Sequence, residues 1–164
     1  MGTGKSTIGR LAAEALRFAF VDTDDLIIER VGRSIPEIFA SQGEEMFRTL
    51  EKQVVSGLEA LDQTVIATGG GVVIDEENLA SLKQHALVVC LWASPETVWE
   101  RVKNQSHRPL LQSPEPLEKI RALLEHRDAF YRRADVLVNT DLRPLREVVT
   151  QVLYHFHDAR MGKA

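Results

Sequence analysis

Apolar and polar residues follow two alternating periods along the chain. Apolar side chains spaced three to four residues apart predict helices, and short apolar or β-branched runs predict strands. The expected helices cover residues 7–16, 25–31, two segments opening at 34 and 41 and ending near 61, 75–83, 95–103, 117–132 and 145–156. The expected strands cover residues 18–21, 64–68, 87–92 and 136–139. Strands that alternate with helices predict an α/β fold with a parallel sheet covered on both faces.

Capping residues sharpen three of the expected helix starts. Ser34 precedes Glu37 by three residues, and Ser41 precedes Glu44 by three. Both pairs have the spacing of a capping box, in which a serine and a glutamate satisfy each other's backbone N–H groups. Ser94 followed by proline is typical of an N-cap with proline in the first turn.

One segment breaks the helical period. Residues 104–116 contain three prolines and are polar at both ends. A loop of this length in a compact domain is usually a lid or a binding loop. We therefore expect a single domain over residues 1–164, with a lid at about 104–116.

Composition excludes several classes of protein. The 164 residues are 44% hydrophobic and 27% charged, enough apolar material to bury a core. No apolar run is long enough to span a bilayer, and no signal peptide is visible. The net charge of −4 disfavours a general nucleic-acid binder. The single cysteine, Cys90, allows no intramolecular disulfide, so we expect a reducing, cytoplasmic compartment.

The first residues carry the clearest chemical motif. The chain begins Met-Gly-Thr-Gly-Lys-Ser-Thr, which holds the Gly-Lys-Ser end of a phosphate loop ahead of a helix. Small Gly2 and Gly4 let backbone N–H groups approach phosphate oxygens at a helix N-terminus. Lys5 is suited to the β- and γ-phosphates and Ser6 to Mg²⁺.

Two further motifs follow predicted strands. Asp22 and Asp24 come after the strand at 18–21, at the end where α/β folds bind ligands. Helix capping would explain Thr23 and Asp25 better than Asp22, so we assign Asp22 and Asp24 to ligand binding. The three glycines at 69–71 follow the strand at 64–68. A tight turn needs one or two glycines, and the third favours close approach of a ligand.

Among the arginines, most are explained by a solvated helix face. Arg108 differs because it stands beside Pro109 in the expected lid. An arginine that a lid brings over phosphates stabilises the charge that develops in phosphoryl transfer. The five histidines show no metal-site spacing, and none is assigned. Phe39 and Phe47 are expected in the core.

Together these motifs resemble the shikimate kinase family, the small phosphate-loop kinases of aromatic amino-acid biosynthesis. The resemblance covers nearly the whole chain. The segments that carry it are 2–11, 22–24, 32–39, 43–48 with Glu51, 69–71, 108–111, and Arg127 with 131–132. Several motifs in the right order are more specific than a phosphate loop alone.

The resemblance implies a fold and a reaction. The fold is a three-layer α/β fold of the nucleoside-monophosphate-kinase type, with a parallel sheet of order 2-3-1-4-5. Its strand 1 would precede residue 1, because the chain begins inside the phosphate loop. We therefore expect the chain as written to be poorly stable and weakly active. The reaction is ATP plus shikimate giving ADP plus shikimate 3-phosphate, with Mg²⁺, in a monomer.

The resemblance also implies a nucleotide site. The residues assigned to ATP are Gly2, Gly4, Lys5, Ser6, Thr7, Arg101, Arg108, Arg143 and Pro144. Lys5 and Arg108 would act in catalysis at the phosphates, and Arg101 with 143–144 would flank adenine. Ser6 would ligate Mg²⁺, and Asp22 would support the ion through water.

The acceptor site is implied in the same way, in a helical segment at about 24–61. Asp24 would hold the shikimate hydroxyls and serve as the candidate base for the 3-hydroxyl. Arg48 and Arg127 would clamp the carboxylate, with Glu51 positioning Arg48. Gly70 would offer its backbone N–H to the substrate.

Two other functions fit some of these residues. A kinase acting on gluconate or a nucleoside monophosphate would also use carboxylates and arginines. A nucleotide-binding protein without activity would need the phosphate loop alone. The presence of Lys5, Asp24 and Arg108 favours an enzyme, because binding alone needs no base.

Overall fold

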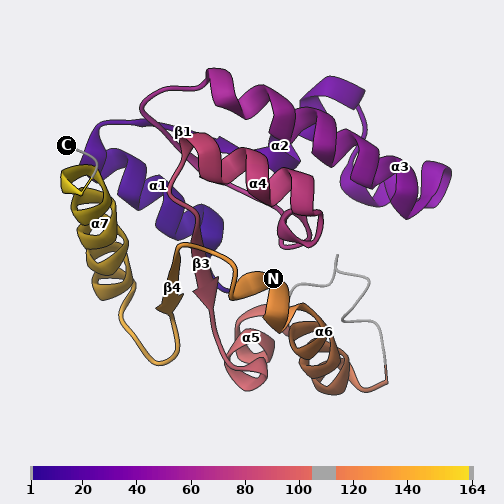
Figure 1. The fold of residues 1–164 in the computed structure, drawn as a ribbon. Coiled ribbons are helices and arrows are strands. Elements are labelled where there is room, and N and C mark those ends of the chain that lie inside the picture. Colours follow the sequence, from indigo (N-terminus) through magenta and orange to yellow (C-terminus); the bar gives the residue numbers. More distant parts are fainter. Residues whose placement is uncertain (1, 105–113, 163–164) are drawn as a thin grey trace. The chain divides into compact units, whose positions relative to one another are not determined.

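The structure is a computed structural model that describes residues 2–104 and 114–162. Its contacts divide the chain into two compact units (Figure 1). Unit 1 comprises residues 1–5 and 88–164, and unit 2 comprises residues 6–87. Helices and parallel strands alternate along the chain, which is the α/β fold that the alternating periods predict.

Unit 2 is built around one pair of parallel strands. Its elements in order are α1 (Lys5–Leu16, which starts at the last residue of unit 1), β1 (Ala19–Asp22), α2 (Thr23–Val31), α3 (Ile35–Gly57), η1 (Leu58–Ala60), β2 (Thr64–Ala67), η2 (Val72–Ile74) and α4 (Glu76–His85). The register places Ala19 opposite Thr64 and Asp22 opposite Ala67. As a result, the carboxyl ends of β1 and β2, where the predicted motifs begin, lie side by side.

Unit 1 repeats this arrangement with a second parallel pair. Its elements are β3 (Val89–Trp92), α5 (Pro95–Val102), α6 (Pro116–Tyr131), β4 (Val136–Asn139) and α7 (Leu145–Met161). Val89 stands opposite Val136 and Trp92 opposite Asn139. The helices α5 and α6 pack together through a core of buried residues, Ala93, Val98, Val102 and Ile120, covered by Trp99 and Leu124.

The strand pairs agree with the implied sheet. β1 pairs with β2 and β3 with β4, in two separate two-stranded parallel sheets. These are the 2-3 and 4-5 pairs of the expected order. The strand at Val136–Asn139 has the predicted bounds, whereas α7 continues past residue 156 to Met161.

Helix α3 confirms one predicted capping box and shows that the other is wrong. The Ser34 backbone N–H donates to Glu37 Oε2 at 2.8 Å, and Glu37 N–H donates to Ser34 Oγ at 3.4 Å. Ser41 instead donates its hydroxyl to the Glu37 carbonyl. The helical path is interrupted at Gly43, where φ is 78° and ψ is 176°. The left-handed φ of this glycine places the bend two residues beyond Ser41.

The lid prediction falls largely on residues 105–113, which lie outside the described residues. Within the described ranges, no helix is both long and apolar enough to cross a membrane.

Replacing Ser34 tests the observed cap. Ser34→Ala should lower the free energy of unfolding by about 0.5–2 kcal/mol, because the first turn of α3 loses its side-chain acceptor. Ser41→Ala is the matched control and should change stability by less than about 0.5 kcal/mol, since a serine bonded back to its own helix adds little. Urea unfolding of both variants measures the difference. Equal losses would mean that the cap at Ser34 contributes nothing specific.

Candidate functional site

Asp22 lies at the junction of β1 and α2 and uses its two carboxylate oxygens separately. Oδ1 accepts the Asp24 backbone N–H at 3.1 Å, which makes Asp22 the N-cap of α2. Oδ2 accepts the Ser6 hydroxyl at 2.8 Å. The prediction that capping falls to Thr23 and Asp25 is therefore wrong, since a strand that runs directly into a helix makes its last residue the cap. Asp22 Oδ2 is thus hydrogen-bonded to Ser6, the residue predicted to bind the metal.

The pair of Ser6 and Asp22 fits a magnesium ion. A hydroxyl and a carboxylate oxygen are the hard ligands that Mg²⁺ takes, and it keeps several waters besides them. Within the described part of the chain, no cluster of three or more His, Cys, Asp or Glu side chains could hold a metal by itself. An ion here would therefore rely on few protein ligands and on substrate phosphates, as Mg²⁺ commonly does.

The protein's own side chains occupy the space beside two of the three glycines in the triglycine turn, residues 69–71. A Cβ on Gly69 would lie 2.8 Å from Glu51 Oε1 and 3.2 Å from Asp24 Oδ1. A Cβ on Gly71 would lie 2.3 Å from Arg48 Nη1. Real Cβ atoms essentially never come within 3.0 Å of another atom, and the 3.2 Å distance to Asp24 is tighter than most real contacts. The glycines at both ends of the turn therefore make room for the predicted substrate-binding side chains, with Gly70 between them.

Arg48 is held by two glutamates of α3. Its Nη1 donates to Glu51 Oε2 at 2.6 Å, while Nε and Nη2 donate to Glu44 Oε1 at 3.3 and 2.8 Å. Partial burial works to lower the pKa of Arg48, but the bonds and charges of Glu44 and Glu51 outweigh it and raise that pKa. The two glutamates thus keep the Arg48 guanidinium charged and hold it in one position.

The geometry leaves part of the Arg48 guanidinium for a ligand. Three of its five N–H donors are used by glutamates within the described residues. The other two lie one on each terminal nitrogen, and such N–H groups form charge-assisted bonds to carboxylates. Glu51 is only 2% exposed, so it orients Arg48 through their ion pair and does not itself face a ligand.

Thr23 fastens the turn to α2. Its side chain is fully buried, and its Oγ1 accepts the Gly69 N–H at 3.2 Å. This bond crosses from the start of α2 to the end of β2. It fixes the distance between Asp24 and the triglycine turn.

Gly2 of the predicted phosphate loop packs closely against α5. Gly2 has a φ of 68°, and a Cβ there would lie 2.9 Å from Val102 Cγ1 and 3.0 Å from Val98 Cγ1. Gly4 has a φ of 88°, also in the left-handed region that glycine favours. Burial raises the pKa of the Cys90 thiol, against the opposing charge of Lys5. Cys90 therefore remains a neutral strand residue.

Arg101, predicted to flank adenine, is bound to the end of β4. Its Nη1 donates to Thr140 Oγ1 at 2.9 Å and its Nη2 to the Thr140 carbonyl at 2.6 Å. The exposed residues Arg143 and Pro144 follow three and four positions later, just ahead of α7. Unit 1 thus brings Arg101 and the chain leading to Arg143 and Pro144 together.

Arg127 lies on α6. Its Nε is buried, and among the described residues no acceptor lies within hydrogen-bond distance. Buried donors are normally satisfied, so this N–H lacks the acceptor that such a group usually has. Arg108, the predicted lid arginine, lies outside the described residues.

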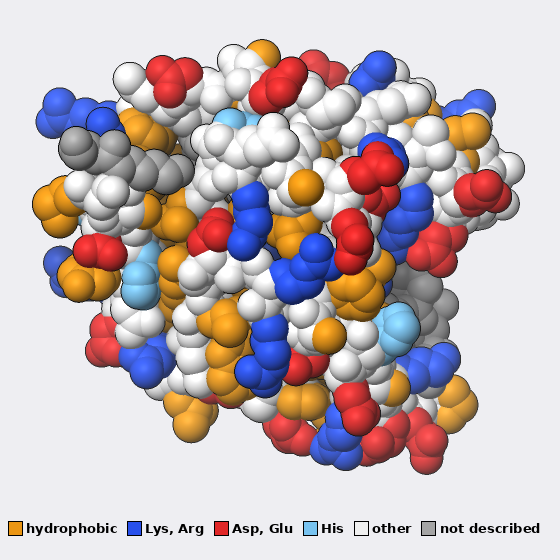
Figure 2. All heavy atoms as spheres, viewed as in Figure 1, with side chains coloured by type: hydrophobic (Ala, Val, Ile, Leu, Met, Phe, Trp, Pro, Cys, Tyr) orange, Lys and Arg blue, Asp and Glu red, His pale blue; other side chains and the backbone are white. Residues whose placement is uncertain are grey.

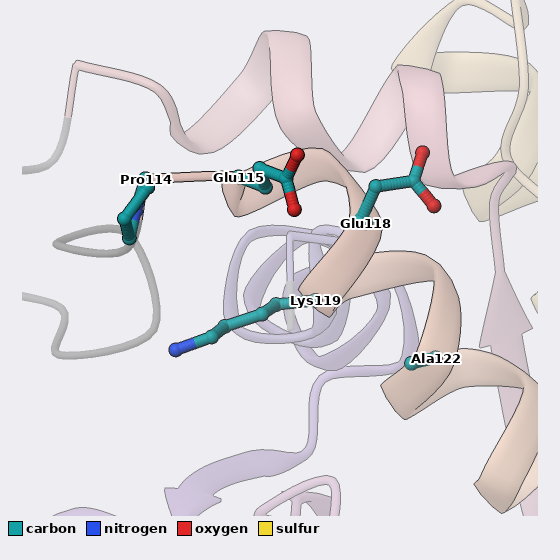
Figure 3. A pocket seen from close by; sticks show the side chains of 5 residues that line it. All are labelled: Pro114, Glu115, Glu118, Lys119 and Ala122. Atoms are coloured by element: carbon teal, nitrogen blue, oxygen red, sulfur yellow. The ribbon is translucent and has the colours of Figure 1, made fainter.

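A shallow pocket occurs elsewhere on unit 1. It is lined by residues at the start of α6, namely Pro114, Glu115, Glu118, Lys119 and Ala122 (Figure 3). None of these is a predicted site residue, and the Glu118 and Lys119 side chains extend away from each other in the view. We assign it no function.

The sequence analysis missed the residues that support the site. Thr23, Thr140 and Asp141 carry no motif of their own. The clue was available only for Thr23, which stands between two assigned aspartates. Nothing local indicates that Thr140 contacts a residue 39 positions earlier.

Comparison with known proteins gives a consistent result. The family model described as shikimate kinase matches residues 1–156. A shikimate kinase of Deinococcus radiodurans is 48% identical, over 100% of this chain and 85% of its own length. One from Thermus thermophilus is 48% identical, over 93% of this chain and 84% of its own.

Solved structures agree. The shikimate kinase from Acinetobacter baumannii in complex with shikimate is 38% identical with a TM-score of 0.90, over 97% of this chain and 89% of that one. The enzyme from Aquifex aeolicus is also 38% identical, with a TM-score of 0.85, over 99% and 95%.

The contact between Thr23 and the glycine turn predicts a stability difference. Thr23→Val should lower the free energy of unfolding by about 1–3 kcal/mol, because the Gly69 N–H loses its acceptor in a buried setting. Thr49→Val is the control, since the Thr49 hydroxyl bonds only its own helix at an exposed position. It should cost less than about 0.5 kcal/mol in the same denaturant titration. Similar losses in both variants would contradict an anchoring role for Thr23.

Proposed function

Because the chain belongs to the shikimate kinase family, we propose that it transfers the γ-phosphoryl group of ATP to the 3-hydroxyl of shikimate through the residues described above. The enzyme class follows from the family: it is an ATP-dependent kinase that uses Mg²⁺. The roles of individual residues are our proposal. The observation that carries it is the meeting of Asp24, Arg48 and the triglycine turn in unit 2.

Recognition of the acceptor rests on opposite charges and hydroxyl partners. Shikimate is a small carboxylate that bears three hydroxyl groups. Two N–H donors of Arg48 and the buried Nε of Arg127 are suited to its carboxylate through charge-assisted bonds. Gly70 offers a backbone N–H between the two glycines that contact Arg48 and Glu51.

Asp24 is the residue proposed to move the proton. Its carboxylate abuts Gly69 and is suited to hold the acceptor hydroxyls. As the hydroxyl oxygen bonds to the γ-phosphorus and the bond to ADP breaks, the hydroxyl proton passes to Asp24. The N–H of Asp24 is bonded to Asp22, so the base is fixed to the residue assigned to metal binding.

The remaining work is charge stabilisation. Ser6 would hold Mg²⁺ directly and Asp22 would support it through water, and the ion when bound neutralises charge on the phosphates. Gly2 and Gly4 would present backbone N–H groups to the phosphates, and Lys5 would reach the β- and γ-phosphates. Thr7 completes the proposed nucleotide residues at the start of α1.

We also propose that the protein works as a cytoplasmic monomer and binds no nucleic acid. Its single cysteine is partly buried and free, which suits a reducing compartment. On the face shown in Figure 2, basic and acidic side chains are interspersed.

Acceptor specificity is the direct test of the proposed function. A coupled assay of ADP release with shikimate, gluconate and nucleoside monophosphates should give turnover with shikimate alone. Faster release with another acceptor would reassign the substrate. Absence of turnover with every acceptor, alongside intact ATP binding, would identify a binding protein instead.

The two proposed carboxylate-binding arginines give a further prediction. Arg48→Ala and Arg127→Ala should each weaken shikimate binding by about 2–5 kcal/mol, as expected for truncating one member of a buried charge pair. ATP affinity should change little. Arg132→Ala, at the residue that follows α6, is the control, because Arg132 is exposed and paired with Asp128. Calorimetric titration decides, and normal shikimate binding by either variant would remove that residue from the site.

A further inference from the structure

Thr140 is a buried polar residue that the proposed mechanism does not use. It follows β4 directly and is 2% exposed. Its Oγ1 donates to the Trp92 carbonyl at 3.2 Å and accepts from Arg101 Nη1 at 2.9 Å. The Thr140 hydroxyl therefore uses its hydrogen as a donor and one of its lone pairs as an acceptor. The hydroxyl links the end of β3 to a guanidinium on α5.

The Arg101 guanidinium is held by its edge. Nη1 and Nη2 both donate to Thr140, one to the side chain and one to the backbone carbonyl. Nη1 also reaches the Gly2 carbonyl at the long distance of 3.5 Å. In-plane bonds fix the orientation of the guanidinium plane but leave its faces for stacking. A guanidinium face is a good platform for an aromatic base.

The chain beyond Thr140 is anchored at the same place. The Asp141 carboxylate accepts the Ser94 N–H at 2.9 Å and the Ser94 hydroxyl at 3.3 Å. Asp141 N–H in turn donates to Asn139 Oδ1 at 2.6 Å. Leu142 then takes a positive φ of 50° with its side chain 97% exposed, ahead of Arg143 and Pro144. The loop is thus rigid at its root and exposed at its tip.

We propose that Thr140 is a positioning residue for the nucleotide base, holding Arg101 and the root of the 141–144 loop in one fixed relation. This inference rests on the proposed function and on the expectation, implied by the resemblance, that Arg101 and residues 143–144 flank adenine. Thr140 itself touches no substrate. Its hydroxyl acts through Arg101, so its loss affects ligands that contain a base and spares ligands that contain phosphates only.

The test compares three ligands in the full chain. Thr140→Val removes the hydroxyl at nearly constant shape. It should weaken ADP binding about threefold to tenfold, the range expected for the net loss of one ordinary hydrogen bond. GDP binding, where measurable, should weaken by the same factor, because stacking does not select the base. Inhibition by magnesium tripolyphosphate and the KM for shikimate should stay within about twofold of the parent.

Matched variants separate positioning from folding. Thr140→Ser keeps the hydroxyl and should restore ADP affinity to within about twofold. Thr150→Val removes an exposed hydroxyl bonded within α7 and should leave every ligand unaffected. In an Arg101→Ala background, Thr140→Val should produce little further loss. If Thr140→Val does not fold, Arg101→Lys, at an exposed position, should show the same loss for ADP but not for tripolyphosphate.

Two results would overturn the inference. Unchanged ADP affinity in Thr140→Val would show that the hydroxyl is dispensable. Equal weakening of ADP and tripolyphosphate would show that it supports the phosphate loop or the fold in general. Either result leaves the proposed function standing while the parent chain phosphorylates shikimate. A parent that binds ADP but never transfers phosphate would fail the proposed function and still allow this test.

Discussion

The ion pair between Glu51 and Arg48 is the interaction on which the acceptor site depends. The carboxylate is 2% exposed and lies 2.6 Å from the guanidinium nitrogen. A buried carboxylate is costly unless it is paired, so Arg48 stabilises the charge of Glu51. Glu51 in turn orients the Arg48 guanidinium. The pair also fixes the triglycine turn, because Glu51 and Arg48 occupy the space that side chains at positions 69 and 71 would need. The turn after β2 thus lies against this pair on α3, and Asp24 of α2 borders the same turn at Gly69.

The nucleotide residues follow a different principle. In unit 1 the supports are neutral and short: two valines of α5 pack against Gly2, and a threonine holds Arg101. Helix α5 serves both features, since its Val98 and Val102 contact Gly2 and its Arg101 reaches Thr140. A rigid helix thereby relates the phosphate-loop glycine to the residues assigned to the base. The residues that support Arg48 at the acceptor site are charged, whereas those that support Gly2 and Arg101 in unit 1 are neutral.

Hydrophobic periodicity and capping motifs predicted the helices and strands well, because both depend on residues that are close in the sequence. The strand at Val136–Asn139 and the box at Ser34 depend on neighbours within a few residues. The errors came from competing local choices: Gly43 moved the bend away from Ser41, and Asp22 took the capping role as β1 ran straight into α2. The proposed site residues come from separate motifs, whereas the residues that support them carry no motif. Thr23 and Thr140 act across 46 and 39 positions, and no local pattern marks such contacts.

A double-mutant cycle on Arg48 and Gly71 tests the central claim most directly. The dissociation constant for shikimate is measured in the parent, Gly71→Ala, Arg48→Ala and the double variant. If Gly71 exists to admit the Arg48 guanidinium, its substitution weakens binding in the parent and adds almost nothing once Arg48 is truncated, with a coupling free energy of about 1–3 kcal/mol. Additive losses, with coupling below about 0.5 kcal/mol, would contradict the account, because the turn and the arginine would then act independently.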